Sequence, residues 1–207
     1  MSGLQTSGNR ALLLSAFAVL LVLFATAASV DLGPVSGHML SHLALMNVVA
    51  PVAAAALVSF GATRFRGPPL WLAATAQLVA LAAWHFPPTH AALSGQLAYT
   101  AASAFLATTA LFFWIALQQA TGRLRWRAVF ALLITGKIAC LIGSLLIFAP
   151  RVLYSAHHAV DIADQQMAGF LMIVACPLSY LVAGVMLTAG WLADLDETET
   201  YQHQGSQ

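Results

Sequence analysis

Charge is what this sequence has least of. Only 7% of its 207 residues are Asp, Glu, Lys or Arg, whereas 60% are hydrophobic. A soluble domain ordinarily carries about 25% charged residues, so the composition indicates an integral membrane protein in contact with lipid. The net charge is only +1 and no basic run occurs. The electrostatic signature of a nucleic-acid-binding protein is therefore absent.

Catalytic signatures are missing as well. The chain has no phosphate-binding glycine loop, nucleophile elbow or zinc-protease motif, and no carboxylate pair is spaced for acid–base chemistry. Its two cysteines, Cys140 and Cys176, lie inside apolar segments and do not form a secreted disulfide framework. Such cysteines are more often small buried hydrophobes than metal ligands. We therefore expect a protein that is not an enzyme.

Long, unbroken apolar runs are present, and they favour helices over a β-barrel. At roughly 20 apolar residues a span, the sequence predicts an all-α, polytopic membrane helical bundle in one domain with about six transmembrane helices. The predicted spans are 11–30, 38–60, 70–87, 96–118, 128–149 and 164–192. The first could instead be a signal peptide, with Ala25-Thr26-Ala27 as its cleavage site. Residues 193–207 form an acidic tail that we expect to be disordered.

The basic residues predict the orientation of the bundle. Those that flank the predicted spans on one side are Arg10, Arg64, Arg66, Arg123, Arg125 and Arg127. The positive-inside rule makes that side cytoplasmic, which places both termini inside the cell. Six of the seven histidines then fall at the outer interface, namely His38, His42, His85, His90, His157 and His158.

This histidine cluster is the strongest sign of function in the residues themselves. His38, His42 and Met46 are spaced i, i+4 and i+8, so they line one helical face. Two imidazoles on one face can share a metal ion, and a nearby thioether favours Cu(I). His85 is followed by Phe86-Pro87, where proline can end the helix and leave His85 level with the pair. The alternative interpretation is interfacial histidines beside a core methionine.

The start of the last span supplies further candidates. Asp161 and Asp164 could cap this helix, or Asp164 could orient a ligand histidine or bind the metal. Gly169 would let a neighbouring helix pack closely. Other side chains expected near the metal are Met39, Asp161, Met172, His157 and His158.

Lys137 stands alone near the middle of the fifth predicted span. An intramembrane lysine is a functional hypothesis by default, and no Asp or Glu lies within any predicted span. Lys137 must therefore use carbonyl groups or water, lose its proton, or contact another protein.

Taken together, these features resemble the CtaG-like family of cytochrome c oxidase assembly factors. The matching stretches are His38-Met39-x-x-His42, Trp84-His85-Phe86-Pro87, Tyr154, and Asp164-Gln165-Gln166-x-Ala168-Gly169-x-x-Met172. The chain departs from the family pattern at Leu43, Gln96 and Tyr99, and in having six rather than about seven spans. The resemblance implies a multi-pass protein of the bacterial plasma membrane that assembles with oxidase subunits. It further implies that the protein supplies copper at the outer face, in which case His38, His42 and His85 would bind Cu(I) rather than zinc or haem.

Two alternatives stay open at this point. The chain could be a non-catalytic structural subunit of a respiratory oxidase complex, or a b-type haem membrane protein with iron held between histidines of two helices. A haem protein usually places such histidines deeper in the bundle than the outer edge predicted here.

The predicted orientation can be tested by labelling single-cysteine variants in intact cells with an impermeant reagent. A cysteine at position 157 should react and one at position 125 should not, because the arginine-rich loop is expected to be cytoplasmic. Labelling at position 125 would reverse the topology and move the histidines inside.

Overall fold

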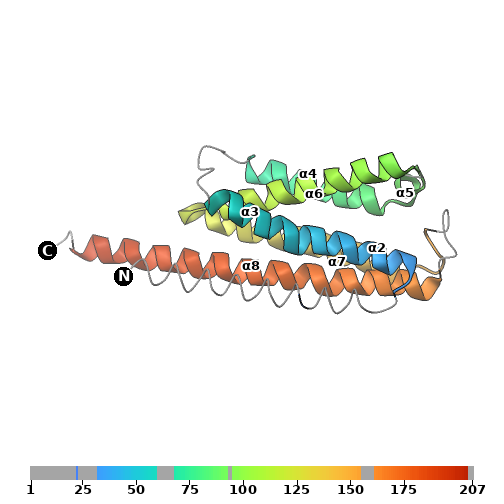
Figure 1. Ribbon diagram of the computed structural model, residues 1–207. Helices are drawn as coiled ribbons and strands as arrows, with labels where there is room; N and C mark the ends of the chain where they lie inside the picture. Colours follow the sequence, from blue (N-terminus) through green and yellow to red (C-terminus); the bar gives the residue numbers. More distant parts are fainter. Residues whose placement is uncertain (1–21, 23–31, 60–67, 93–94, 155–160, 205–207) are drawn as a thin grey trace.

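A computed structural model describes Val22 and residues 32–59, 68–92, 95–154 and 161–204 (Figure 1). The expected first span, 11–30, lies outside the described residues apart from Val22, and so do His157 and His158. Across the described ranges the secondary structure is helical, with no strand. The all-α prediction is therefore confirmed for this part of the chain.

Four of the described helices are long and apolar enough to cross a membrane. They span Pro34–Val58, Gln96–Gln118, Arg125–Phe148 and Ile162–Ala193, and Leu70–His85 is a shorter apolar helix. The elements in order are α2 (Pro34–Ala44), η1 (Leu45–Val49), α3 (Ala50–Ser59), α4 (Leu70–His85), α5 (Pro87–Ala92), α6 (Gln96–Gln118), η3 (Gly122–Leu124), α7 (Arg125–Phe148) and α8 (Ile162–Gln204). Their length and composition support a helical membrane protein, while the number of six spans and the orientation of the termini stay predictions.

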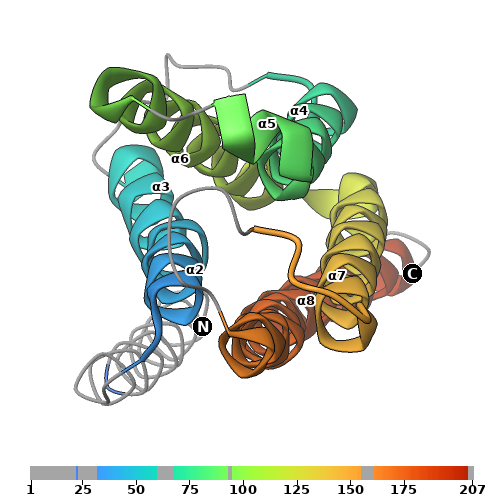
Figure 2. The same ribbon diagram turned by 90° about the vertical axis from the view of Figure 1, so that its right-hand side faces the viewer.

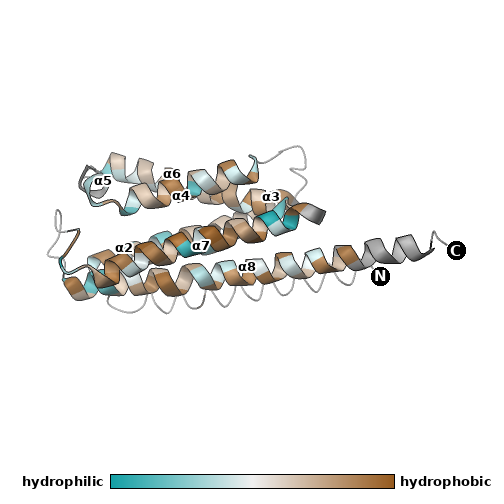
Figure 3. Cartoon of the chain, turned by 180° about the vertical axis from the view of Figure 1, so that it is seen from behind, coloured by the Kyte–Doolittle hydropathy of each residue, from teal (hydrophilic) through white to brown (hydrophobic). Residues whose placement is uncertain are grey.

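The helices form a ring when viewed end-on (Figure 2). Helices α7 and α8 pack against each other, α2 packs on α8, and α4 and α6 pair on the other side. Hydrophobic residues prevail along α7 and α8 (Figure 3). Large side chains such as Leu141 and Leu181 are more than half exposed on the outside of the bundle, as expected where helices face lipid rather than water.

Proline sets the ends of two helices. Pro34 occupies the first turn of α2, where its missing N–H is not needed. α4 ends at His85, and Phe86 adopts an extended conformation with φ −78° and ψ 117°, as expected for a residue that precedes proline. The prediction that proline would leave His85 in the last turn of this helix is confirmed.

Helix α8 extends further than expected. It runs through Pro177 and continues to Gln204, so the prediction of a disordered tail is wrong for residues 193–204. The tail continues a helix that is already formed and therefore needs no new nucleation. Its Glu and Gln residues are also good helix formers.

Helices α7 and α8 approach each other closely at Gly143 and Gly169. A methyl group added at Gly169 would lie 2.6 Å from the backbone oxygen of Gly143, and one added at Gly143 would lie 2.9 Å from the oxygen of Gly169. The backbones touch because neither residue has a side chain. The expected packing role of Gly169 is thereby confirmed.

We expect Gly169→Ala to destabilise the protein by about 1–3 kcal/mol, because the added methyl group must push two backbones apart. The matched control is Gly184→Ala in the same helix, since a methyl group there meets no atom within 4 Å. That change should alter stability by less than about 1 kcal/mol. Unfolding in detergent, followed by circular dichroism, measures both variants, and equal effects would contradict the close contact.

Candidate metal site

The centre of the candidate site is the pair His38 and His42 on α2. Their Nε2 atoms face each other at 3.0 Å, and the two rings meet edge-on with centroids 4.4 Å apart. At this distance one ring donates its N–H to the lone pair of the other. The helical spacing of four residues therefore brings the rings together, as the sequence predicts.

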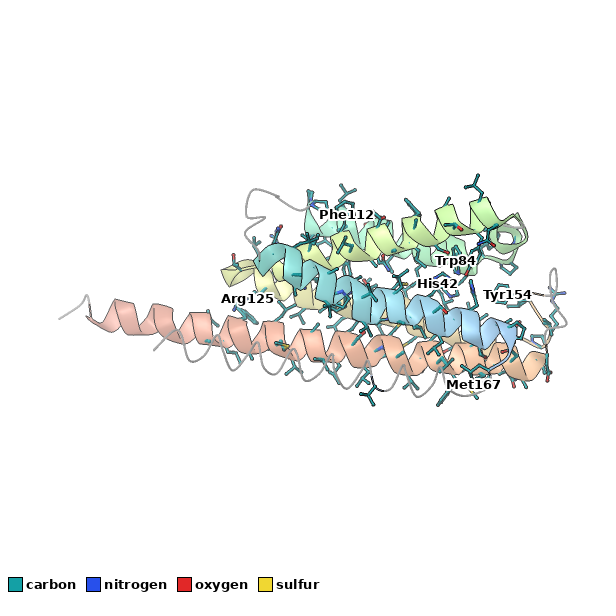
Figure 4. The ribbon with its side chains drawn as sticks, viewed as in Figure 1. His42, Trp84, Phe112, Arg125, Tyr154 and Met167 are labelled. Carbon is teal, nitrogen blue, oxygen red and sulfur yellow. The ribbon has the colours of Figure 1, made fainter. Side chains whose placement is uncertain are left out.

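Two aromatic residues from other helices enclose the pair. The Tyr99 hydroxyl on α6 lies 2.7 Å from Nδ1 of His38. The indole of Trp84 on α4 stacks on His38, with centroids 5.6 Å apart, and lies 4.5 Å from His42. His42 is only 5% exposed. Figure 4 shows His42 and Trp84 near the end of the bundle where Tyr154 lies, far from Arg125.

The separation of the two Nε2 atoms is close to the one that a shared metal ion requires. Two nitrogens that each bind a tetrahedral ion at about 2.05 Å lie about 3.3 Å apart, and the observed separation is 3.0 Å. A metal ion would need the rings to part by only a few tenths of an ångström. When Nδ1 of His38 donates to the Tyr99 hydroxyl, the contact is of the kind that fixes the tautomer of a ligand histidine, and Nε2 is left free to bind.

His85 is anchored separately from this pair. Its Nδ1 donates to the carbonyl of Leu81 at 2.7 Å, one turn back on α4, so the lone pair of the ring is on Nε2. Tyr154 donates its hydroxyl to the backbone carbonyl of His85 at 3.0 Å. Burial raises the pKa of Tyr154 to about 12, so this hydroxyl keeps its proton at physiological pH. Both contacts fix the end of α4 that carries His85.

Three ligands are not assembled in the described part of the chain. No group of three His, Cys, Asp or Glu side chains there could hold one metal ion. The structure brings His38 and His42 together, and metal binding by this pair and by His85 stays a prediction.

Asp164 has a clear structural task. Its carboxylate accepts hydrogen bonds from the backbone N–H groups of Val35 and Ser36, each at 2.9 Å, and Ser36 donates its hydroxyl to the carbonyl of Asp164. Asp164 on α8 thus caps the first turn of α2. A methyl group added at Gly33 would overlap the Asp164 carboxylate, so glycine is needed there. Asp161 caps its own helix through the N–H of Ala163 at 3.2 Å.

The next two residues of α8 hold the end of α7. Gln165 is fully buried, and its amide donates to the carbonyl of Leu146 at 3.2 Å and accepts from the N–H of Leu153 at 2.7 Å. Gln166 donates to the carbonyl of Ile147 at 3.1 Å. The Asp164-Gln165-Gln166 stretch therefore joins α8 to both neighbouring helices.

The candidate methionines are all buried, at 4% exposure or less for Met39, Met46 and Met172. Met46 lies one turn below His42, and its sulfur is 4.0 Å from the amide nitrogen of Gln77. Lys137 is exposed on the outside of α7.

Met46 also belongs to a widened turn. Residues Leu45–Val49 form a π-helix, in which Ala50 donates to the carbonyl of Leu45. In this register the next donor would be Pro51, which has no N–H. The indole of Trp114 on α6 donates to the carbonyl of Met46 instead, at 2.9 Å. Asn47, in the same turn, accepts a hydrogen bond from Ser179 at 2.7 Å.

Sequence reasoning did not assign Trp84 or Tyr99 to the site. Trp84 appeared only as the neighbour of His85, and Tyr99 only as a departure from the family pattern. Tyr99 does fall within the first turn of a predicted span that begins at Gln96, at the histidine end of the bundle. This position in the sequence could have indicated that Tyr99 lies near the histidines.

A comparison with protein families shows to which family the chain belongs. Residues 62–194 match the family described as cytochrome c oxidase caa3 assembly factor (Caa3_CtaG). The chain belongs to this family. The matched range contains His85 and the Asp164-Gln165-Gln166 stretch, whereas His38 and His42 precede it. No curated protein and no solved structure matches the chain. Membership of a family of assembly factors supports a role in which the protein associates with cytochrome c oxidase.

We expect Asp164→Ala to destabilise the protein by about 1–2 kcal/mol, because two N–H groups at the start of α2 lose their acceptor. Asp161→Ala, which removes a single exposed bond, is the matched control and should have a smaller effect. Thermal unfolding in detergent compares the two, and equal losses would argue against the interhelical cap.

Proposed function

We propose that this protein assists the assembly of a haem–copper oxidase by holding Cu(I) at the outer face of the membrane. The observation that carries the proposal is the convergence of the His38 and His42 Nε2 atoms at 3.0 Å, beneath the indole of Trp84. Each imidazole directs its Nε2 toward the other, so one metal ion could take the place of the proton that the two rings share.

The donor set favours copper over zinc. Imidazole suits both ions, so the histidines alone do not choose between them. Met46 supplies a thioether one turn deeper on the same helical face, and soft sulfur ligands select Cu(I). Met46 lies about 12 Å along the helix from His38 at 1.5 Å per residue, so we assign it to a transfer step rather than to the same ion. His85 is the proposed third ligand.

The orientation of the bundle supports placement of this site outside the cytoplasm. His42 lies in the half of the bundle that ends near Tyr154, and Arg125 lies toward the other end (Figure 4). Arginine-rich loops favour the cytoplasmic side. We therefore propose a multi-pass protein of the bacterial plasma membrane with both termini inside. The oxidase subunit that receives the copper would approach from the outer face.

We expect wild-type protein to bind Cu(I) under reducing conditions and His42→Ala to lose most of that binding. Tyr99→Phe should weaken the affinity by about 10–100-fold, as is typical when a hydrogen bond to a ligand histidine is removed. His85→Ala tests the third ligand. Competition with a colorimetric Cu(I) chelator measures all four proteins in detergent.

The matched control is His203→Ala, which removes a histidine from the tail and should leave copper binding unchanged. Equal copper binding by wild type and His42→Ala, or none by wild type, would contradict the site. An unaffected His85→Ala variant would limit the site to the pair on α2. A Soret band in the purified protein would instead support the haem alternative.

A further inference from the structure

Lys137 occupies an unusual position on the outside of α7. It is exposed, and its neighbours on the same helical face are apolar, with Leu133 59% and Leu141 60% exposed. These residues are four apart, so they form one stripe along the helix. A single cation thus interrupts a surface that otherwise suits lipid.

The depth of Lys137 makes this position costly. It lies twelve residues after Arg125 and eleven before Phe148, the two ends of α7, which is about 16–18 Å from either end at 1.5 Å per residue. The hydrocarbon half-thickness of a bilayer is about 15 Å. The four-carbon stem of lysine is far shorter than this, so the ammonium group cannot easily reach the phosphates of either lipid leaflet.

The chain itself offers no acidic partner at that depth. The sequence has seven Asp and Glu residues. Asp31 precedes α2 in the sequence, Asp161 directly precedes α8, Asp164 lies in the first turn of α8, and the other four are Asp194, Asp196, Glu197 and Glu199 in the tail. The acidic residues that the structure describes therefore lie toward one or the other end of the spans. A second copy of the chain, inserted in the same direction, would bring its acidic residues to these same two levels.

We propose that the stripe of α7 around Lys137 docks a transmembrane helix of a different polypeptide that carries Asp or Glu near mid-depth. An opposite charge at that level satisfies the ammonium group, and polar residues inside a membrane ordinarily pair in this way. Leu133 and Leu141 supply the apolar contacts on either side. This surface is separate from the histidine pair, so the proposal does not depend on copper binding.

The test uses the full-length protein in lipid vesicles with a synthetic polyleucine helix as the probe. One probe carries a single mid-span Asp and the other only leucine. Energy transfer between labelled protein and probe should show roughly tenfold tighter association with the Asp probe, given the usual strength of polar contacts between membrane helices. Lys137→Met should remove this preference. Lys137→Asp should transfer it to a probe that carries Lys.

A matched control comes from the neighbouring helix. Gly136 on α7 faces the ring of Tyr180 on α8, with 3.2 Å between a built methyl group and the ring, so positions 137 and 181 lie at similar depth. Leu181 is 64% exposed, and Leu181→Met should leave the preference intact. Equal association of both probes with wild type would overturn the proposal, as would a preference that survives in Lys137→Met.

Cells provide a second measurement. Photo-reactive residues placed at positions 133 and 141 should crosslink to a polypeptide with a mid-span acidic residue, and one at position 181 should not. Crosslinking to another copy of this chain at position 141 would overturn the proposal.

Discussion

The hydrogen bonds from the first turn of α8 to its neighbouring helices are the contacts on which the bundle depends. Helix ends leave N–H and C=O groups without intrahelical partners, and such groups are especially unfavourable near hydrocarbon. The Asp164 carboxylate accepts hydrogen bonds from two N–H groups at the start of α2. The side-chain amides of Gln165 and Gln166 donate hydrogen bonds to carbonyl groups at the end of α7. Three consecutive residues thus fix the ends of two other helices, so the interfacial edge of the bundle is set by polar contacts rather than by apolar packing alone.

The position of the histidine pair depends on these hydrogen bonds, because the pair lies on the helix whose first turn they hold. His38 follows the capped residues Val35 and Ser36 by less than one turn, while Trp84 and Tyr99 approach from α4 and α6. The site is therefore built from three helices, and a fourth, α8, holds the first of them in place. A separate hydrogen bond, from the Tyr154 hydroxyl to the carbonyl of His85, fixes α4 at the same end of the bundle. Loss of the Asp164 hydrogen bonds or of the Tyr154 hydrogen bond would displace the ring nitrogens of the histidines, because no contact within the site itself would hold them in place.

Much of this architecture could be predicted from the sequence, because hydropathy and local spacing determine it. Apolar runs gave the described spans, proline gave the end of α4 at His85, and four-residue spacing gave the His38–His42 pair. The partners of Asp164 could not be predicted, since they lie 128 and 129 residues away in the chain. Tyr99 was missed for the same reason, because its contact with His38 arises only when α6 packs against η1 and α3, which continue α2. The helical tail was missed because composition describes isolated segments, and this one extends an existing helix.

The π-helical turn at Leu45–Val49 sets the rotation of the histidines about the helix axis. Each residue of an α-helix turns the chain by about 100°, and a π-turn accommodates one residue more than an α-turn. Without that extra residue, everything before it would rotate by about 100° relative to α3, and the imidazoles would leave the indole of Trp84. The hydrogen bond from the Trp114 indole to the Met46 carbonyl thus holds the two halves of one membrane helix at the relative rotation about the helix axis that the site needs.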